Sequence, residues 1–249
     1  MNLIIEQGNT STKVAVYNNK GRMQTSCLYE EFAYSSLESF FEKYDLRYGI
    51  MSTVIRPDSK LLSSLENALQ HFIFLDENVP IPVQIQYRTP DTLGRDRLAA
   101  VVGAHYLHPG KNILVIDAGT AITYELLEAS GIYRGGNISP GMTTRFRALN
   151  HFTGKLPLIR EEENIPMIGY STQTAIQAGV VNGIVYEMDG YIDDLRREYT
   201  DLLVFLTGGH SFYFERRLKS SIFADINLVL TGLNRILEYN VENKESRSC

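Results

Sequence analysis

The chain opens with LIIEQGNTS at residues 3–11 and returns to the same design with LVIDAGTAI at residues 114–122. In each stretch, apolar residues typical of a β-strand end on an acid, which is followed by the glycine and hydroxyl residues of a tight turn. Glu6 aligns with Asp117 at a separation of 111 residues. This separation is longer than the roughly 20–50 residues of solenoid repeats. The pattern therefore predicts two related α/β subdomains, each opening with an acidic strand end.

The spacing of apolar residues predicts alternating strands and helices in both halves. In the first half, strands are expected at 2–6, 12–18, 22–29, 50–55 and 83–87, and helices at 35–44, 58–72 (with Asp58 as N-cap) and 95–107. In the second half, strands are expected at 112–117, 120–129, 130–139 and 202–206, with a long helix at about 172–197 and further helices after 206. The predicted subdomains are residues 1–110 and 111–249, and ENKESRSC at the end is expected to be a solvated tail.

Composition narrows the class of protein. The 249 residues carry 24 basic and 29 acidic side chains, a net charge of −5, which argues against a nucleic-acid or membrane-surface partner. No apolar run approaches the roughly 18 residues of a transmembrane helix, and the N-terminus lacks the features of a signal peptide. Cys27 and Cys249 make no disulfide scaffold, and the five histidines show no metal-ligand spacing. A reducing cytoplasmic compartment is therefore expected.

The first turn carries the residue types of a polyphosphate-binding loop. They are Glu6, Gln7, Gly8, Asn9, Thr10, Ser11, Thr12 and Lys13. Glycine lets the backbone approach a ligand closely, and successive N–H groups and hydroxyls can hold phosphate oxygens. The Glu6 carboxylate can hold magnesium directly or through water, and Lys13 can neutralise phosphate charge. The alternative is an ordinary β-turn, because Gly-Asn-Thr is common turn chemistry.

The second turn, Asp117–Thr120, repeats the acid, the glycine and the hydroxyl of the first. Two such turns that face each other across a cleft would clamp one nucleotide. Thr207–His210 follows an apolar strand, where a glycine pair permits packing of an adenine or approach of phosphate to a helix N-terminus. The alternative at that position is a plain strand-to-helix turn. None of these stretches has the spacing of a Walker loop or of a GxGxxG fingerprint.

Two further stretches are candidates for the substrate pocket. Gly94–Arg97 lies at the start of the helix expected at 95–107, where the helix dipole favours anions. There Asp96 would act as a general base and Arg97 would bind a carboxylate or phosphate, or the charges would form only a first-turn salt bridge. Gly135–Gly141 would let a substrate lie against bare backbone, and a mobile hairpin exit is the alternative.

Five motifs in this order resemble those of type III pantothenate kinase. They are Glu6–Thr10 with Lys13, Gly94–Arg97, Asp117–Thr120, Gly135–Gly141 and Thr172–Gly179, and the match spans about residues 1–210. The resemblance implies the duplicated α/β fold of the acetate and sugar kinase, chaperone and actin superfamily. In that fold two ribonuclease H-like subdomains surround a nucleotide cleft.

The resemblance further implies ATP-dependent phosphorylation of pantothenate to 4′-phosphopantothenate, the first step of coenzyme A synthesis. It implies Mg²⁺, a monovalent cation (K⁺ or NH₄⁺), and a homodimer with pantothenate near the subunit interface. Carried over by motif, residues 6–13 and Thr120 would contact ATP, and Asp117 would bind the monovalent cation. The pantothenate pocket would consist of Tyr87, Gly94, Arg95, Asp96, Arg97 and Thr172, the last supplied across the dimer. Asp96 would be the proton acceptor.

One position departs from the family pattern. The family normally opens with Asp-x-Gly-Asn-Thr, whereas Glu6 here adds a methylene that moves the carboxylate. A catalytically impaired, nucleotide-binding regulatory paralogue on the same fold is therefore one alternative. A sugar or carboxylate kinase or phosphatase of the same superfamily is the other, and the Gly94–Arg97 and Thr172 motifs disfavour it.

Overall fold

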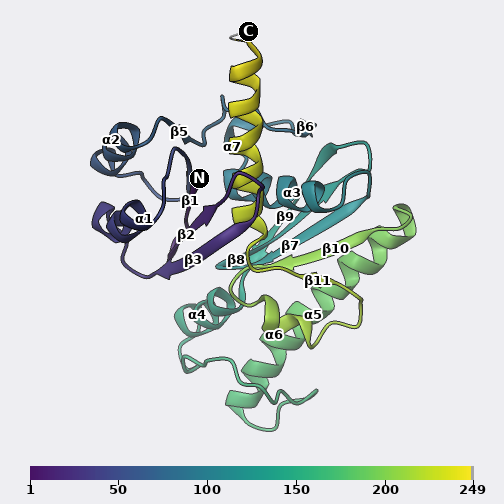
Figure 1. Cartoon of the computed structure of the whole chain (residues 1–249). Coiled ribbons are helices and arrows are strands. Elements are labelled where there is room, and N and C mark those ends of the chain that lie inside the picture. Colours follow the sequence, from purple (N-terminus) through teal and green to yellow (C-terminus); the bar gives the residue numbers. More distant parts are fainter. Residues whose placement is uncertain (248–249) are drawn as a thin grey trace. The chain divides into compact units, whose positions relative to one another are not determined.

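A computed structural model describes residues 1–247, so Cys249 lies outside the described residues (Figure 1). The chain forms two compact units. Unit 1 consists of Met1–Pro109, Gly131–Tyr133 and the segment from Asn227 onward, and unit 2 consists of Gly110–Ser130 and Arg134–Ile226. Over residues 1–247, no helix is both long and apolar enough to cross a membrane.

Unit 1 is built around a five-stranded sheet with the order β3-β2-β1-β4-β5. β1 pairs antiparallel with β2 and parallel with β4. In the outer pairs, β3 is antiparallel to β2 and β5 is parallel to β4. Its elements are β1 (Asn2–Gln7), β2 (Thr12–Tyr17), β3 (Met23–Tyr29), a 3₁₀ turn (Tyr34–Leu37), α1 (Glu38–Lys43), β4 (Tyr48–Thr53), α2 (Ser59–Ala68), β5 (His71–Phe74), β6 (Gln84–Ile85), a second 3₁₀ turn (Pro90–Thr92), α3 (Arg95–Leu107) and α7 (Leu228–Arg247).

Unit 2 repeats this design, since its sheet has the order β11-β10-β7-β8-β9, with β6 added beside β9. The central strand β7 again pairs antiparallel with the strand that follows it and parallel with β10. The elements are β7 (Ile113–Ala118), β8 (Ala121–Leu127), β9 (Ile132–Pro140), α4 (Met142–Phe152), α5 (Thr172–Glu198), β10 (Leu203–Thr207), α6 (Ser211–Glu215) and β11 (Phe223–Ala224). The shared strand order confirms the predicted duplicated α/β fold.

Several predicted elements need correction. The helix expected at 58–72 begins at its predicted N-cap, where the Asp58 carboxylate accepts a hydrogen bond from Lys60 N (2.9 Å), but it ends at Ala68. His71–Phe74 instead forms β5, because Ile73 is buried when this segment pairs with β4. The helix α4 was not expected. The predicted tail is helical as far as Arg247, because α7 continues through it.

A division at residue 110 assigns α7 to the second half, whereas α7 belongs to unit 1. Close packing against α3 accounts for this. A Cβ at Gly103 would overlap the carbonyl oxygen of Leu228, and a Cβ at Gly232 would overlap that of Ala99. The absence of side chains at both positions lets the two helix backbones touch. Helix α7 therefore completes unit 1 although it follows unit 2 in the sequence.

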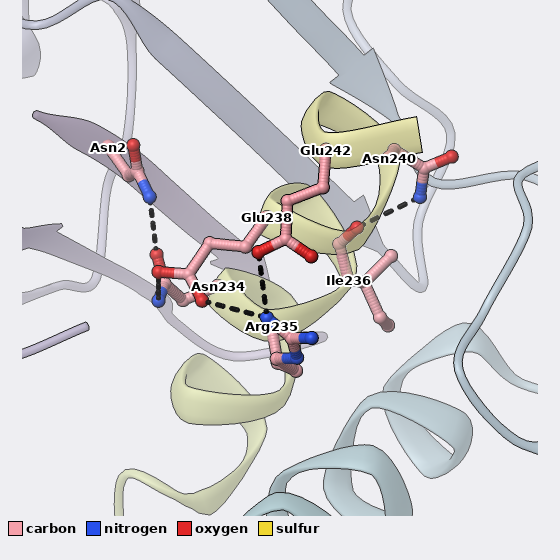
Figure 2. A network of polar contacts seen from close by, with 7 residues as sticks. All are labelled: Asn2, Asn234, Arg235, Ile236, Glu238, Asn240 and Glu242. Carbon is pink, nitrogen blue, oxygen red and sulfur yellow. Dashed lines mark hydrogen bonds and ion pairs between the residues drawn. The ribbon is translucent and has the colours of Figure 1, made fainter. Parts of the chain in front are cut away.

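Polar contacts also fasten α7 to the first strand (Figure 2). Asn2 Nδ2 donates to Asn234 Oδ1 (2.8 Å), and Asn234 Nδ2 donates to Glu238 Oε1 (2.9 Å). Arg235 forms ion pairs with Glu238 (3.5 Å) and Glu242 (3.3 Å) along the helix. Both asparagines are buried, and buried amides are stabilising only when they are hydrogen-bonded. These bonds fix the register of α7 against β1.

Candidate active site

The first turn in unit 1 places an acid beside a lysine. Glu6 ends β1 and lies opposite Lys13 of β2, with 3.7 Å between Glu6 Oε2 and Lys13 Nζ. Glu6 Oε2 is buried and accepts no hydrogen bond from the described part of the chain. Burial raises the pKa of the Glu6 carboxyl, the Lys13 ammonium opposes this shift, and the negative charge of Asp96 adds to it. The electrostatic coupling brings Asp96 into the same charged cluster.

The other residues of this turn divide into supporting and accessible ones. Gly8 N donates to Ser11 O (2.9 Å), which closes the turn. Gln7 Oε1 accepts a hydrogen bond from Thr53 Oγ1 (3.0 Å), and Thr12 is buried, so both side chains support the strands. Asn9 and Thr10 are exposed at the tip of the turn. The accessible side chains are thus at the positions where a phosphate is expected.

Gly94 shapes the start of α3 around Asp96. Asp96 Oδ1 accepts a hydrogen bond from Arg97 N (2.9 Å), which fixes the carboxylate in the first turn of the helix. A Cβ at Gly94 would lie 2.6 Å from that same Oδ1 and 3.2 Å from Arg97 Cδ. Any larger residue at this position would therefore displace the carboxylate. Arg95 Nη2 is held by Pro90 O (3.1 Å).

A tyrosine that sequence reasoning missed supports Arg97. Arg97 is buried, and its Nη2 donates to the hydroxyl of Tyr133 (3.3 Å), which is fully buried at the start of β9. The rings of Tyr87 and Tyr133 lie 6.2 Å apart. Tyr133 thus joins two residues expected in the pantothenate pocket. Its sequence neighbours predicted a strand but contained no signal for this contact, which depends on pairing between β6 and β9.

In unit 2, two glycines pack closely against Asp117. A Cβ at Gly208, which has φ of 91°, would overlap Asp117 Oδ1 and the backbone of Ala118. A Cβ at Gly119 would lie 3.2 Å from the same oxygen. Carboxylate and backbone oxygens are suitable ligands for hard cations. The Asp117 carboxylate is therefore a candidate ligand for a cation.

The segment Gly135–Gly141 braces the second turn. Thr120 O accepts hydrogen bonds from Gly141 N (3.0 Å) and from Thr144 Oγ1 (2.7 Å). A Cβ at Gly141 would overlap the carbonyl oxygen of Gly119. Most of the segment lies in β9, so it forms a strand and not a hairpin exit. Close packing against the Asp117–Thr120 turn explains the glycine at 141.

Buried polar atoms without hydrogen-bond partners surround the glycine pair at Gly208 and Gly209. They are Thr207 Oγ1, His210 Nδ1 and Ser211 Oγ, none of which has a hydrogen-bond partner in the described part of the chain. Native proteins pair nearly all buried polar groups, with protein, water or ligand. A bound polar ligand or water would supply partners for these three groups.

Thr172 lies at the first position of α5, behind a capping box formed by Ser171 and Thr174. It lines a pocket of about 740 Å³ in unit 2, to which β9, α4 and α5 contribute. The lining residues are Pro140, Arg145, Ala148, Leu149, Leu156, Thr172, Ala175, Ile176, Gly179 and Val180. The wall is mostly apolar, with Arg145 and Thr172 as its polar side chains.

The acidic residues present fit a magnesium ion that also binds phosphates. Among residues 1–247 no group of three or more His, Cys, Asp or Glu side chains is arranged to hold a metal by itself. Mg²⁺ is usually held through one or two carboxylates together with substrate phosphates and water. Glu6 Oε2, buried and without a hydrogen-bond partner, provides one such carboxylate oxygen.

The family model described as type III pantothenate kinase matches residues 2–194. A type III pantothenate kinase from Bacteroides fragilis is 51% identical over 241 residues, covering 96% of this chain and 98% of that protein. The structure of a protein described as a conserved putative Baf family transcriptional activator from Campylobacter jejuni is similar with a TM-score of 0.61 at 21% identity, covering 96% of this chain and 99% of that one. A putative 2-dehydro-3-deoxygalactonokinase from Sinorhizobium meliloti gives a TM-score of 0.58 at 12% identity, with coverage of 96% and 99%.

At these low identities the two structures show only that the fold is shared. The family match covers more than half of the chain, and the relative from Bacteroides fragilis extends it over nearly the whole length. The sequence motifs, the duplicated sheets and these matches agree, so the chain belongs to the type III pantothenate kinase family.

Proposed function

We propose that the protein transfers the γ-phosphoryl group of ATP to the primary hydroxyl of pantothenate, giving ADP and 4′-phosphopantothenate for coenzyme A synthesis. The observation that carries this proposal is the charged cluster of Glu6, Lys13 and Asp96 in a chain of this family. It combines a phosphate-facing turn with a carboxylate fixed at the start of a helix. Both substrates are small polar molecules, which agrees with a cytoplasmic enzyme.

Asp96 is the proposed general base. Its carboxylate would accept the proton of the pantothenate hydroxyl as the new P–O bond forms, and phosphoryl transfer otherwise requires mainly positioning and charge neutralisation. The bond from Arg97 N holds Oδ1, which leaves Oδ2 to meet the hydroxyl. Lys13 would offset phosphate charge. Arg97, held by Tyr133, would bind the carboxylate of pantothenate in a fixed orientation.

The other proposed site residues lie in the two turns and in the pantothenate pocket. Residues 6–13 and Thr120 would contact ATP, while Tyr87, Gly94, Arg95 and Thr172 would line the pantothenate pocket with Asp96 and Arg97. Glu6 would hold Mg²⁺, which supplies charge neutralisation on the phosphates. Asp117 would hold K⁺ or NH₄⁺ beside its glycine cradle. The retained charge and the buried oxygen of Glu6 support an active enzyme despite the added methylene.

We also propose that the protein works as a homodimer. Several large apolar side chains of unit 2 are strongly exposed. They are Phe152, Leu158, Met167, Ile168, Tyr170 and Tyr186. Large exposed apolar areas often mark the surfaces through which proteins interact. A second copy of the chain would bury these residues, which belong to unit 2, as does the pocket lined by Thr172. The molar mass in solution, measured by light scattering, should be twice that of the 28.2 kDa chain.

The direct test is ADP release from the purified protein with ATP, Mg²⁺ and pantothenate, in potassium and then in sodium buffer. We expect turnover that depends on pantothenate and on potassium. Asp96→Asn should lower kcat by about 10²–10⁴, the usual contribution of a general base, with nucleotide binding intact. Absence of turnover in the wild type, with nucleotide still bound, would overturn the kinase proposal in favour of a regulatory paralogue.

A further inference from the structure

A polar network around Glu187 joins four elements of unit 2. Glu187 projects from α5, and its Oε1 accepts a hydrogen bond from the hydroxyl of Tyr124 in β8 (2.7 Å). Its Oε2 accepts one from Arg145 Nη2 in α4 (2.6 Å) and one from Ser139 Oγ in β9 (3.2 Å). Both carboxylate oxygens are therefore engaged. Of these four residues, only Ser139 lies in a stretch that the sequence singled out, Gly135–Gly141.

The network holds an ionised carboxylate. Burial by itself would raise the pKa of Glu187, but the hydrogen bonds from Arg145, Tyr124 and Ser139 outweigh burial and lower it. Burial and the bond to Glu187 raise the pKa of Tyr124, so the phenol stays protonated and remains a donor. Charge-assisted hydrogen bonds of this kind are short and roughly twice as strong as neutral ones. The arrangement is rigid because three donors share one acceptor group.

Arg145 connects this network to the backbone that precedes the contact with the Asp117–Thr120 turn. Its Nε donates to Pro140 O (2.8 Å) and its Nη2 to Ser139 Oγ (2.8 Å), which fixes the end of β9. The next residue, Gly141, donates its N–H to Thr120 O, and a Cβ there would lie 2.6 Å from that oxygen. A shift of the Pro140–Gly141 backbone would therefore move the turn.

We infer that Glu187, acting through Arg145 and the Pro140–Gly141 backbone, is a positioning residue that sets the geometry of the Asp117–Thr120 turn. The inference rests on the proposed function, which assigns ATP and a monovalent cation to this turn. Displacement of binding groups by about 1 Å can reduce rates by about 10²-fold. Loss of the network should therefore weaken binding at the turn more than it weakens binding of pantothenate.

The test is Glu187→Gln, which keeps the size of the side chain but removes the charge that holds Arg145. Two constants are measured in the full-length protein: the potassium concentration for half-maximal turnover and the dissociation constant of Mg-ADP by calorimetry, which needs no turnover. We expect both to rise about tenfold, the effect of losing one charge-assisted hydrogen bond. The KM for pantothenate should change less than these two constants, because Thr172 is the one proposed pantothenate-pocket residue in unit 2, whereas Gly94–Arg97 belongs to unit 1.

The matched control is Glu128→Gln. Glu128 also lies in unit 2 and pairs with Arg134 at 2.6 Å, and its side chain is 21% exposed against 24% for Glu187. It has no bond to the second turn, so both constants should stay at the wild-type values. Equal shifts in the two variants, or wild-type constants in Glu187→Gln, would overturn the inference.

Tyr124→Phe provides a second variant that keeps the ring and removes one bond to Glu187. We expect smaller shifts in the same direction, which keeps the inference testable if Glu187→Gln does not fold. Unchanged constants in a folded Tyr124→Phe protein would also contradict it. Failure of the proposed function would look different, because the wild type would then release no ADP with pantothenate while calorimetry still reports on the turn.

Discussion

Replacing Gly232 by alanine tests the crossing of α3 and α7. A Cβ at Gly232 would overlap the carbonyl oxygen of Ala99 and lie 2.8 Å from Gly103 N, so the obstacle is backbone and not a flexible side chain. Overpacking of this kind costs about 1–3 kcal/mol. Alanine recovers about 1 kcal/mol over glycine inside a helix. Because backbone cannot rotate away, we expect the upper end of that cost and a net loss of about 2 kcal/mol.

The assay is thermal unfolding followed by circular dichroism. For chains of this size 1 kcal/mol corresponds to about 2–4 °C, so Gly232→Ala should lower Tm by about 4–8 °C. Gly190→Ala in α5 is the matched control, since a Cβ there meets nothing within 4 Å. It should raise Tm by about 1–4 °C through helix propensity alone. A Gly232→Ala protein that melts at or above the wild-type temperature would refute the packing argument.

Three further outcomes test the site. Gly94→Ala should lower kcat by at least about tenfold with little change in Tm, because its Cβ would push against Asp96 Oδ1; steady-state kinetics measures this. Tyr133→Phe should raise the KM for pantothenate about fivefold and leave kcat nearly unchanged, since it removes only the hydrogen-bond partner of Arg97. Glu6→Gln should be more stable than the wild type at pH 7–8, because the raised pKa of Glu6 makes its ionised form costly when folded. Tm measured against pH should show this difference shrinking as pH falls through that raised pKa, and a constant difference would contradict the reasoning.

Local sequence patterns predicted the central strands well, because the apolar residues that mark a strand are neighbours in the sequence. The helix Arg95–Leu107 has the predicted bounds, since it begins at a glycine before charged residues and continues through small apolar ones. The repeat predicted that the two halves share one design, and the common strand order of the two sheets agrees with this. The division at residue 110 could not anticipate α7, because its place depends on contact between glycines that are far apart in the sequence.

The residues that support the site were harder to find than the residues proposed to act in it. Acids, glycines and hydroxyls in a turn form a short pattern, so Glu6, Asp96 and Asp117 stand out in the sequence. Tyr133 meets Arg97 through the pairing of strands that are distant in the sequence, and Glu187 meets Arg145 from α5. The residues next to them in the sequence form no recognisable motif. Such partners can be located only once the tertiary structure is known.

The two halves kept one feature of their common design and changed another. Glu6 and Asp117 occupy equivalent strand ends, and each has a buried hydroxyl residue at the same level of the neighbouring parallel strand, Ser52 and Thr207. On the antiparallel side Glu6 faces Lys13, whereas Asp117 faces the neutral Thr123.

This difference in charge suits the two turns to different ligands. A lysine beside the first acid favours an anion at that turn, since its positive charge can offset phosphate oxygens. At the second turn the opposing residue of the antiparallel strand, Thr123, brings no positive charge, and the glycines at 119 and 208 pack close to the carboxylate. Carboxylate oxygens are suitable ligands for hard cations. This difference agrees with the proposed function, which assigns polyphosphate to the first turn and the monovalent ion to the second.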